Sequence, residues 1–202
     1  PQRIMHPHVT RQTAPQKTAK KATAHDRELD RLLRKIRIEE TPLGKGVFAR
    51  RTLTADLVVG EILGEVLDDH PEDSSYCMEL QSGRLLEPGP QLRFLNHSCE
   101  PNCELFYWVD EETNAPAEDR LWLQTLRRIA AGEEMTIDYC WPADAAIRCR
   151  CQAASCRGWV VDPDEISRIA RSQPEAWAEY LTDTEAVAAK KKRPGARGKT
   201  VK

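Results

Sequence analysis

The sequence predicts an α+β fold that is mainly β, built from short strands and small sheets, with helices near its C-terminal end. The chain has 202 residues, which is room for one ordinary domain with tails. From about residue 36 to residue 140, short apolar runs are broken by Gly, Pro and Asp, a pattern typical of strands and turns. No helical segments occur regularly between these runs, which argues against a doubly wound parallel sheet.

Helical spacing appears at both ends of this β-rich region. A short amphipathic helix is expected within residues 26–37, whose apolar residues are Leu29, Leu32, Leu33 and Ile36. Strands are expected over residues 36–40, 46–50, 57–67, 76–80, 104–109, 121–126 and 134–139. Two helix starts follow, one with Asp162 as N-cap and one near Pro174. The second helix would place Trp177 and Leu181 on one face.

The charges are distributed unevenly along the chain. The 30 basic and 32 acidic residues give a net charge of −2. Residues 1–25 hold five basic residues and no acidic one, and residues 190–202 hold seven basic residues and no acidic one. Residues 26–189 therefore keep 18 basic and 32 acidic residues, a net charge of −14. An acidic body of this kind attracts basic partners.

The two basic tails lack the large apolar side chains that offset the entropy of ordering, so both are expected to be disordered. Solvation alone explains such tails, and non-specific contact with nucleic-acid phosphates is a second interpretation. No apolar run approaches the roughly 20 residues that span a bilayer, so no membrane segment is expected. The lack of a charged-then-apolar leader and an odd count of seven cysteines favour a reducing, intracellular location, either cytoplasmic or nuclear.

Three cysteines form a C-x-C-x4-C cluster near the C-terminal end of the body, namely Cys149, Cys151 and Cys156. Structural zinc normally takes four ligands, so this cluster needs a fourth ligand from elsewhere in the fold. The alternative is that the three cysteines are unrelated. The remaining cysteines are Cys77, Cys99, Cys103 and Cys140.

Three other segments concentrate glycines or polar residues. Residues 44–49 read G-K-G-V-F-A, where two glycines permit a tight turn or a ligand lying against the backbone. Residues 93–103 read R-F-L-N-H-S-C-E-P-N-C. Burial of these successive polar groups costs free energy unless each one forms a hydrogen bond or binds a ligand. Residues 132–139 read G-E-E-M-T-I-D-Y, a turn followed by a strand that ends in tyrosine. Each segment alone is compatible with an ordinary turn, loop or strand.

In this order, and with the trailing cysteine cluster, the segments resemble the SET-domain protein lysine methyltransferases that carry a post-SET zinc segment. The resemblance covers roughly residues 36–160, and N-H-S-C-x-P-N is its most specific element. It implies a SET-domain fold of the β-clip type. The implied parts are a disordered basic tail (1–25), the SET domain with a short leading helix (26–140), the post-SET zinc segment (141–160), C-terminal helices (161–189) and a second disordered basic tail (190–202).

The resemblance also implies roles for individual residues. Residues implied to bind S-adenosylmethionine are Gly44, Lys45, Gly46, Val47, Phe48, Tyr76, Arg93, Asn96, His97 and, more loosely, Trp159. Tyr139 matches the catalytic tyrosine. The implied zinc ligands are Cys99, Cys149, Cys151 and Cys156, so that Cys99 supplies the fourth thiolate.

The chemistry of methyl transfer agrees with these assignments. Transfer from a sulfonium to an amine is an in-line displacement, so the enzyme has to align donor and acceptor. A free lysine has a pKa of about 10.4, and a narrow apolar channel lowers it, so a dedicated strong base is not needed. Phe106, Tyr107 and Trp108 are candidates for the channel walls. The implied substrate is a Lys-rich protein such as a histone or a DNA-associated protein, and the chain's own tails are a further candidate.

Two other functions stay open from the sequence alone. One is a catalytically silent SET-like module that binds a peptide or chromatin. In such a module, the catalytic tyrosine or the cofactor-binding motif is expected to be substituted. Tyr139, Asn96 and His97 are intact, which argues against this alternative. The other is a zinc protein that binds nucleic acid through its basic tails, and it leaves the N-H-S-C-E-P-N segment unexplained.

Overall fold

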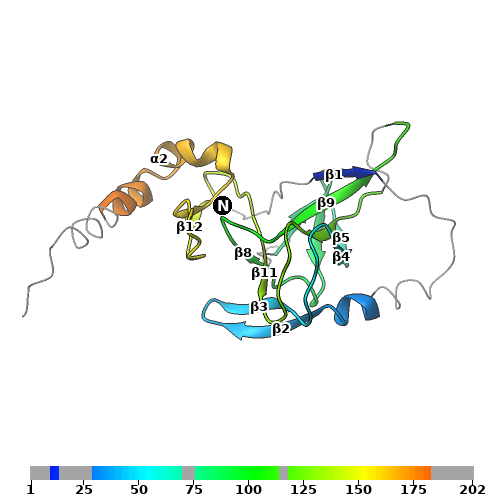
Figure 1. Ribbon diagram of the computed structural model, residues 1–202. Coiled ribbons are helices and arrows are strands. Elements are labelled where there is room, and N and C mark those ends of the chain that lie inside the picture. The colour runs from blue at the N-terminus through cyan, green and yellow to red at the C-terminus, as the bar shows by residue number, and fades with distance from the viewer. Residues whose placement is uncertain (1–9, 14–28, 70–75, 114–117, 183–202) are drawn as a thin grey trace, which may run out of the picture.

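The computed structural model describes residues 10–13, 29–69, 76–113 and 118–182 (Figure 1). Its strands are β1 (Thr10–Thr13), β2 (Ile36–Thr41), β3 (Gly44–Ala49), β4 (Val58–Glu61), β5 (Gly64–Leu67), β6 (Met78–Glu79), β7 (Leu85–Pro88), β8 (Asn96–His97), β9 (Cys103–Val109), β10 (Trp122–Thr125), β11 (Glu134–Ile137), β12 (Ile147–Arg148) and β13 (Trp159–Val160). A 3-10 helix η1 (Pro163–Arg168) and a helix α2 (Ile169–Ser172) follow. The predicted mainly-β class with C-terminal helices is confirmed.

One four-stranded sheet has the order β1-β9-β10-β4. The long strand β9 pairs antiparallel with β10 and, along its other edge, parallel with β1. Strand β1 lies inside the tail that is expected to be disordered, so the structure differs from that expectation at residues 10–13. A strand edge orders a polar segment through its backbone groups alone, without an apolar face on that segment. The rest of that tail and all of residues 190–202 lie outside the described residues.

A second four-stranded sheet, with the order β2-β3-β11-β8, positions the polar segments. Strands β2 and β3 form an antiparallel hairpin that closes at Thr41 and Gly44. Strand β11 pairs antiparallel with β3 and parallel with β8, which sets Thr136 opposite Asn96 and Ile137 opposite His97. The three segments that the sequence singles out therefore meet in one sheet (Figure 1).

Two smaller sheets complete the β structure. Strands β5, β7 and β6 form one, and β12 pairs with β13 in the other. The predicted strand over residues 57–67 is divided into β4 and β5. Strands β7, β8, β12 and β13 were outside the sequence-based expectation, because segments of two to four residues show too little alternation to be recognised.

The predicted helix starts are confirmed. The Asp162 side chain caps η1 by accepting a hydrogen bond from the Asp164 N–H at 2.8 Å. Residues 174–182 are helical, with Trp177 half-buried and Leu181 45% exposed, so only part of the predicted apolar face is covered. At the other end, residues 29–33 are helical, but Ile36 pairs with Ala49 as the first residue of β2 and is not part of the helix.

Two clusters of buried side chains hold the described residues together. The larger one joins the strands of the two four-stranded sheets around Leu95, Leu123 and Met135. The smaller one lies between the C-terminal helices and β13, and contains Trp159 and Ile169. Within the described ranges, no helix combines the length and the apolar character that crossing a membrane requires.

Candidate functional site

Two pockets open where β8, β11 and the turn between β2 and β3 meet the cysteine-rich segment. Their volumes are about 470 Å³ and about 540 Å³. Five residues line both pockets, namely Leu43, Asn96, His97, Arg150 and Cys151. The pockets are therefore two parts of one site.

Tyr139 forms a wall of the first pocket. Its hydroxyl donates a hydrogen bond to the Leu95 carbonyl at 2.6 Å, and its ring lies 5.3 Å from the Trp141 ring. Burial raises the pKa of Tyr139 well above its ordinary value, and the nearby Tyr76 and Glu134 raise it further. The hydroxyl therefore stays protonated at neutral pH, where it orients hydrogen-bonding partners and does not act as a base.

Strand β8 presents Asn96 and His97 to both pockets. The Asn96 amide donates to the Lys45 carbonyl at 3.1 Å and to the Glu134 carboxylate at 2.7 Å. His97 Nδ1 accepts a hydrogen bond from the Tyr139 N–H at 3.3 Å. These contacts tie the glycine segment, β8 and the end of β11 into one unit.

Asn102 is a buried clamp on β11, with 2% of its surface exposed. Its amide donates to the Glu134 carbonyl at 2.7 Å, and its side-chain oxygen accepts from the Thr136 N–H at 2.9 Å. The side chain thus replaces a strand partner along part of β11. Sequence reasoning gave no role to this residue, although its place as the last Asn of N-H-S-C-E-P-N was the available signal.

The backbone conformation and the packing of residues 44 and 46 explain why both are glycine. Gly44 has a φ of +112°, which favours glycine and makes the tight turn that closes the hairpin. A Cβ added at Gly46 would lie 2.5 Å from Glu134 Oε1 and 2.9 Å from Thr41 Cγ2. Gly46 therefore lets β3 pack closely against the site carboxylate.

Four sulfur atoms from two distant parts of the chain form one cluster, those of Cys99, Cys149, Cys151 and Cys156. Cys99 Sγ lies 3.7 Å from Cys149 Sγ and 3.9 Å from Cys156 Sγ. The other four sulfur pairs also interact. Zinc–sulfur bonds of about 2.3 Å in a tetrahedral site place the sulfurs about 3.8 Å apart. The cluster therefore has the dimensions of a closed four-sulfur metal site.

Each sulfur of this cluster accepts at least one backbone hydrogen bond. The pairs are Arg157 N–H to Cys99 (3.4 Å), Cys151 N–H to Cys149 (3.4 Å), Cys99 N–H to Cys151 (3.5 Å) and Gly158 N–H to Cys156 (3.4 Å). Such donors favour thiolates. Burial raises the pKa of Cys151, but backbone hydrogen bonds from Cys99 and Ala153 outweigh it and lower the pKa to about 7. Burial raises the pKa of Cys99 to about 11, so a divalent metal has to displace protons when it binds.

His97 lies between the sulfur cluster and Tyr139. Its Nε2 is 3.4 Å from Cys99 Sγ, and ligand atoms of His97, Cys99, Cys149 and Cys151 all lie within 4.8 Å of one another. His97 Nδ1 faces the Tyr139 N–H at 3.3 Å and the Asp138 carboxylate at 3.4 Å, which leaves Nε2 to face the Cys99 sulfur. This contact orients a ligand of the cluster, as outer hydrogen bonds do in metal sites.

Asp138 and Arg157 fasten the cysteine segment to the end of β11. The two side chains form a bidentate ion pair with N–O distances of 2.8 Å. Burial raises the pKa of Asp138, but the adjacent His97 ring and the hydrogen bonds from Arg157 lower it to about 2. The carboxylate is therefore charged throughout the neutral range and holds the Arg157 backbone against the Cys99 sulfur.

The other predicted cofactor residues lie at different distances from the pockets. Arg93 stacks on the Tyr76 ring at 4.9 Å, and Lys45 lies over Phe94 at 5.2 Å, next to Tyr76. Neither Tyr76 nor Arg93 lines the two described pockets, although Tyr76 is close enough to Tyr139 to raise its pKa. Val47 is fully buried in the larger core and Phe48 is half-buried, and both lie on β3 outside the pocket walls.

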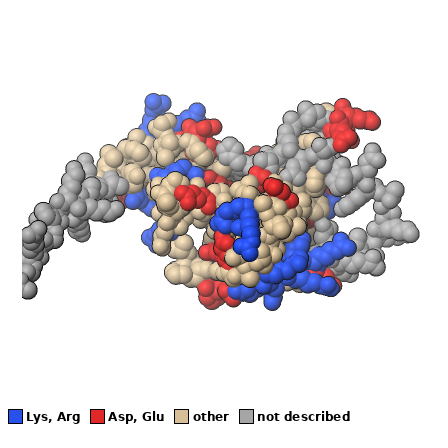
Figure 2. Space-filling view, in the orientation of Figure 1, with Lys and Arg blue, Asp and Glu red and all other residues tan. Residues whose placement is uncertain are grey.

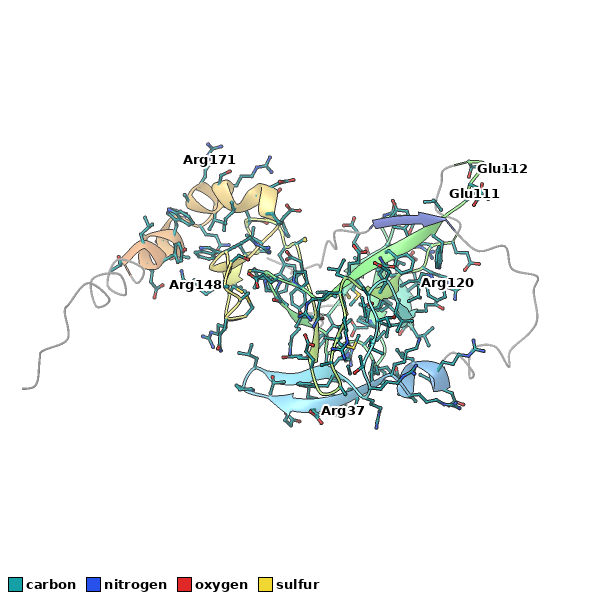
Figure 3. The ribbon with its side chains drawn as sticks, viewed as in Figure 1. Arg37, Glu111, Glu112, Arg120, Arg148 and Arg171 are labelled. Carbon is teal, nitrogen blue, oxygen red and sulfur yellow. The ribbon has the colours of Figure 1, made fainter. Side chains whose placement is uncertain are left out.

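Trp159 is 1% exposed and packs against Trp177 and Tyr180, with ring centroids 6.2 Å and 5.7 Å away. Helical residues thus cover the ring that is expected beside the cofactor. Arg148, which stacks on Tyr180 at 4.2 Å, lies on the pocket wall instead. Figure 3 shows Arg148 below the C-terminal helices.

The candidate channel residues lie on β9, and none of them lines the two described pockets. Phe106 is fully buried, Tyr107 is nearly so, and neither they nor Trp108 line the two pockets. The first pocket is closed instead by residues that sequence reasoning did not name, which are Leu43, Trp141, Ile147, Arg148 and Val160. An aromatic residue two positions after Tyr139 was the one local signal for this wall.

Comparison with known proteins agrees with this geometry. Residues 44–140 match the family model of the SET domain. The histone-lysine N-methyltransferase SETD2 of Homo sapiens is 31% identical over 142 residues, which cover 61% of this chain and 5% of that protein. The histone-lysine N-methyltransferase ASHR3 of Arabidopsis thaliana is 31% identical over 144 residues, which cover 63% of this chain and 28% of that protein. The histone-lysine N-methyltransferase ash1 of Drosophila melanogaster is 31% identical over 133 residues, which cover 57% of this chain and 6% of that protein. The chain thus spans a small part of the length of these relatives.

Proposed function

Residues 44–140 are a SET domain, and on that basis we propose that the protein is an S-adenosylmethionine-dependent protein lysine N-methyltransferase. Relatives named histone-lysine N-methyltransferases support protein lysine methylation as the reaction. The observation that carries the proposal is the buried Tyr139 hydroxyl, held at the wall of a pocket that Asn96 and His97 also line.

The second pocket suits the methyl donor by its charges. Glu134 and Arg150 both line it, so it offers a carboxylate and a guanidinium to the zwitterionic amino-acid end of S-adenosylmethionine. When bound, that molecule would supply an electrophilic methyl group on a sulfonium. We assign its binding to the backbone of residues 44–46 together with Asn96 and His97, with Tyr76 and Arg93 as supporting neighbours.

The first pocket suits the lysine. Leu43, Trp141, Ile147 and Val160 make its walls largely apolar, and such walls disfavour an ammonium and lower the lysine pKa. The Tyr139 hydroxyl donates a hydrogen bond to the Leu95 carbonyl, so its oxygen keeps lone pairs that accept from a lysine N–H. The tyrosine then orients the amine for in-line attack without taking its proton.

We assign the four-cysteine cluster to structural zinc. Four sulfur ligands close the coordination sphere, which is typical of structural sites and leaves no open position for catalysis. Cys149 and Cys151 also line the first pocket, so the metal would hold part of its wall in place. Zinc would thereby couple the order of residues 149–156 to activity.

The proposed substrate is a Lys-rich tail of a histone or another DNA-associated protein. The net charge of −14 over residues 26–189 attracts such a segment. The lysines of this chain's own tails lie outside the described residues.

The test is labelled methyl transfer from S-adenosylmethionine to histones and to Lys-rich peptides. Tyr139→Phe removes only the hydroxyl, and we expect kcat to fall on the order of 100-fold, as when one positioned hydrogen-bonding group is lost from an active site. Tyr107→Phe removes a hydroxyl outside the described pockets and is expected to leave the rate unchanged. Equal labelling by Tyr139→Phe and wild type would remove the catalytic assignment, and no labelling by either would favour a silent binding module.

A further inference from the structure

A basic concavity lies apart from the site described above. It has a volume of about 540 Å³ and is lined by Arg31, Arg34, Lys35 and Arg51. Arg31 belongs to the helix of residues 29–33, with Arg34 and Lys35 in the turn that follows it, and Arg51 follows β3. A hydrogen bond from the Arg50 N–H to the Lys35 carbonyl, 2.8 Å long, joins these two segments. Figure 2 shows basic side chains gathered over this part of the molecule.

Three arginines line this concavity, and they have no carboxylate partner among the described residues, a property that they share with Arg50, Arg128, Arg148, Arg150 and Arg171. Seven other arginines of the described ranges form ion pairs, namely Arg37, Arg84, Arg93, Arg120, Arg127, Arg157 and Arg168. By contrast, no carboxylate of the described residues lies within 4.0 Å of a nitrogen of Arg31, Arg34 or Arg51. Residues 26–189 carry a net charge of −14, whereas the four residues that line this concavity are all basic.

The arrangement is unfavourable in the free protein. Arg31 and Arg34 are three residues apart along one helical turn, where like charges repel. Lys35 and Arg51 face the same concavity, and the Lys35 amine is held there by the carbonyls of Val58 and Val59 at 3.1 Å and 2.5 Å. A polyanion that spans the concavity would remove this repulsion. The acid-free basic segment of residues 1–25 precedes this helix in the sequence.

We propose that this concavity binds the phosphate backbone of a nucleic-acid duplex. Guanidinium groups match phosphate oxygens in bidentate geometry, and duplex DNA carries one charge per about 1.7 Å, so one stretch of backbone meets several of these side chains. The described lining has no aromatic residue on which single-stranded bases could stack and no apolar residue to enter a membrane. The charge and composition of the lining therefore favour sequence-independent contact with a duplex.

This inference goes beyond the proposed methyltransferase activity. The concavity shares no described lining residue with the two pockets of the site, so a bound duplex leaves that site open. An enzyme held on a duplex in this way would meet substrate proteins that are themselves bound to nucleic acid. Duplex binding is measured without methyl transfer. A negative binding result would therefore contradict this inference and leave the proposed methyltransferase activity untouched.

The test uses the full chain and a matched pair of charge-reversed double variants. Arg31→Glu/Arg34→Glu alters the concavity, and Arg168→Glu/Arg171→Glu reverses two exposed arginines at the same spacing on η1 and α2. Figure 3 shows Arg171 pointing outward from α2, away from the helix of residues 29–33. Arg51→Glu is a third variant that tests the other segment of the concavity.

Fluorescence anisotropy with DNA and RNA duplexes of about 20 base pairs, between about 50 and 200 mM salt, gives affinities and salt slopes. We expect Arg31→Glu/Arg34→Glu to weaken duplex binding at least about tenfold and to reduce the salt slope by nearly two, because each phosphate contact contributes about 0.9. The control double variant is expected to keep a slope close to wild type. The relative affinities of the two duplexes show whether DNA or RNA is the source of the phosphate backbone.

Three results would overturn the proposal. They are an absence of duplex binding by wild type, an equal loss of binding in both double variants, and tighter binding of wild type to phosphatidylserine vesicles than to either duplex. Thermal unfolding separates these results from misfolding, since removing like-charge repulsion is expected to leave Tm unchanged or raised. Methylation of a free Lys-rich peptide by Arg31→Glu/Arg34→Glu is expected to match wild type.

Discussion

Asn102 illustrates how one buried polar side chain fixes the strand that leads to Tyr139. Its amide and carbonyl groups bond the Glu134 carbonyl and the Thr136 N–H, so β11 is held by a side chain where a strand would otherwise pair. The N-H-S-C-E-P-N segment therefore does two jobs. Its first part lines the pockets, and its last residue positions the strand that ends beside them.

Asn102→Asp tests this role because it keeps the acceptor for the Thr136 N–H but removes the donor to the Glu134 carbonyl. The lost donor and the added charge beside Glu133 are expected to lower the free energy of unfolding by about 1–3 kcal/mol. Urea unfolding measures the change. Gln81→Glu makes the same amide-to-carboxylate change at an exposed residue and is the control. Equal midpoints for both variants would show that the clamp contributes little.

At the scale of elements, the cysteine segment has little regular structure of its own. Residues 149–156 contain no strand or helix, and β12 and β13, which flank the segment, are two residues each. The segment is held by the sulfur cluster, the Asp138–Arg157 ion pair and the hydrogen bonds from the Ser155 N–H and hydroxyl to Glu100, at 2.7 Å and 2.5 Å. Its order is therefore expected to depend on metal.

Chelation tests that dependence. The purified protein is expected to carry about one zinc per chain by elemental analysis, and a strong chelator is expected to lower Tm. Mass spectrometry after treatment with N-ethylmaleimide is expected to show new labelling of Cys99, Cys149, Cys151 and Cys156. Cys103 is fully buried and serves as the internal control that stays unlabelled. Labelling of the four cysteines to the same extent before chelation would contradict a metal-held cluster.

Local signals in the sequence were sufficient for some elements and not for others. The N-cap Asp162 and the spacing of Cys149, Cys151 and Cys156 are visible because their partners are close in the sequence. Cys99 lies 50 residues before Cys149, so only a family resemblance could join it to the cluster. Leu43 and Arg148 line the pocket only because of tertiary packing. The sequence around an isolated residue shows no periodic pattern that would predict such a contact. Trp159 shows the same limit, because a helix that follows in the chain covers its ring.

At the scale of the whole molecule, the larger core unites both four-stranded sheets, and Cys103 lies within it opposite Thr125. Burial raises the pKa of the Cys103 thiol to about 12. In the unfolded chain the same thiol ionises near its ordinary pKa of about 8.5. The buried neutral thiol therefore contributes stability that is fully present below about pH 8.5 and is lost as the pH rises toward 12.

Alkaline unfolding tests this linkage. Between about pH 9 and 11, the Cys103 thiol is expected to reduce the free energy of unfolding by up to about 1.4 kcal/mol per pH unit. Cys103→Ala is expected to be less stable at pH 8 but to lose stability less steeply above about pH 9. Urea unfolding curves at several pH values give both slopes. Parallel slopes for wild type and Cys103→Ala would exclude this thiol as the cause.

The dispersed origin of the pocket walls has a kinetic consequence. The first pocket takes residues from the hairpin turn at Leu43, from β8, from Tyr139 and from β13 at Val160, which are up to 117 positions apart in the chain. Contacts between such distant residues form late, because closing long loops is entropically costly before the contacts are made. Ligand capture should therefore appear only in the last phase of refolding, and a nascent chain should be inactive until its residue 160 has left the ribosome. In this protein, activity would report that folding is complete.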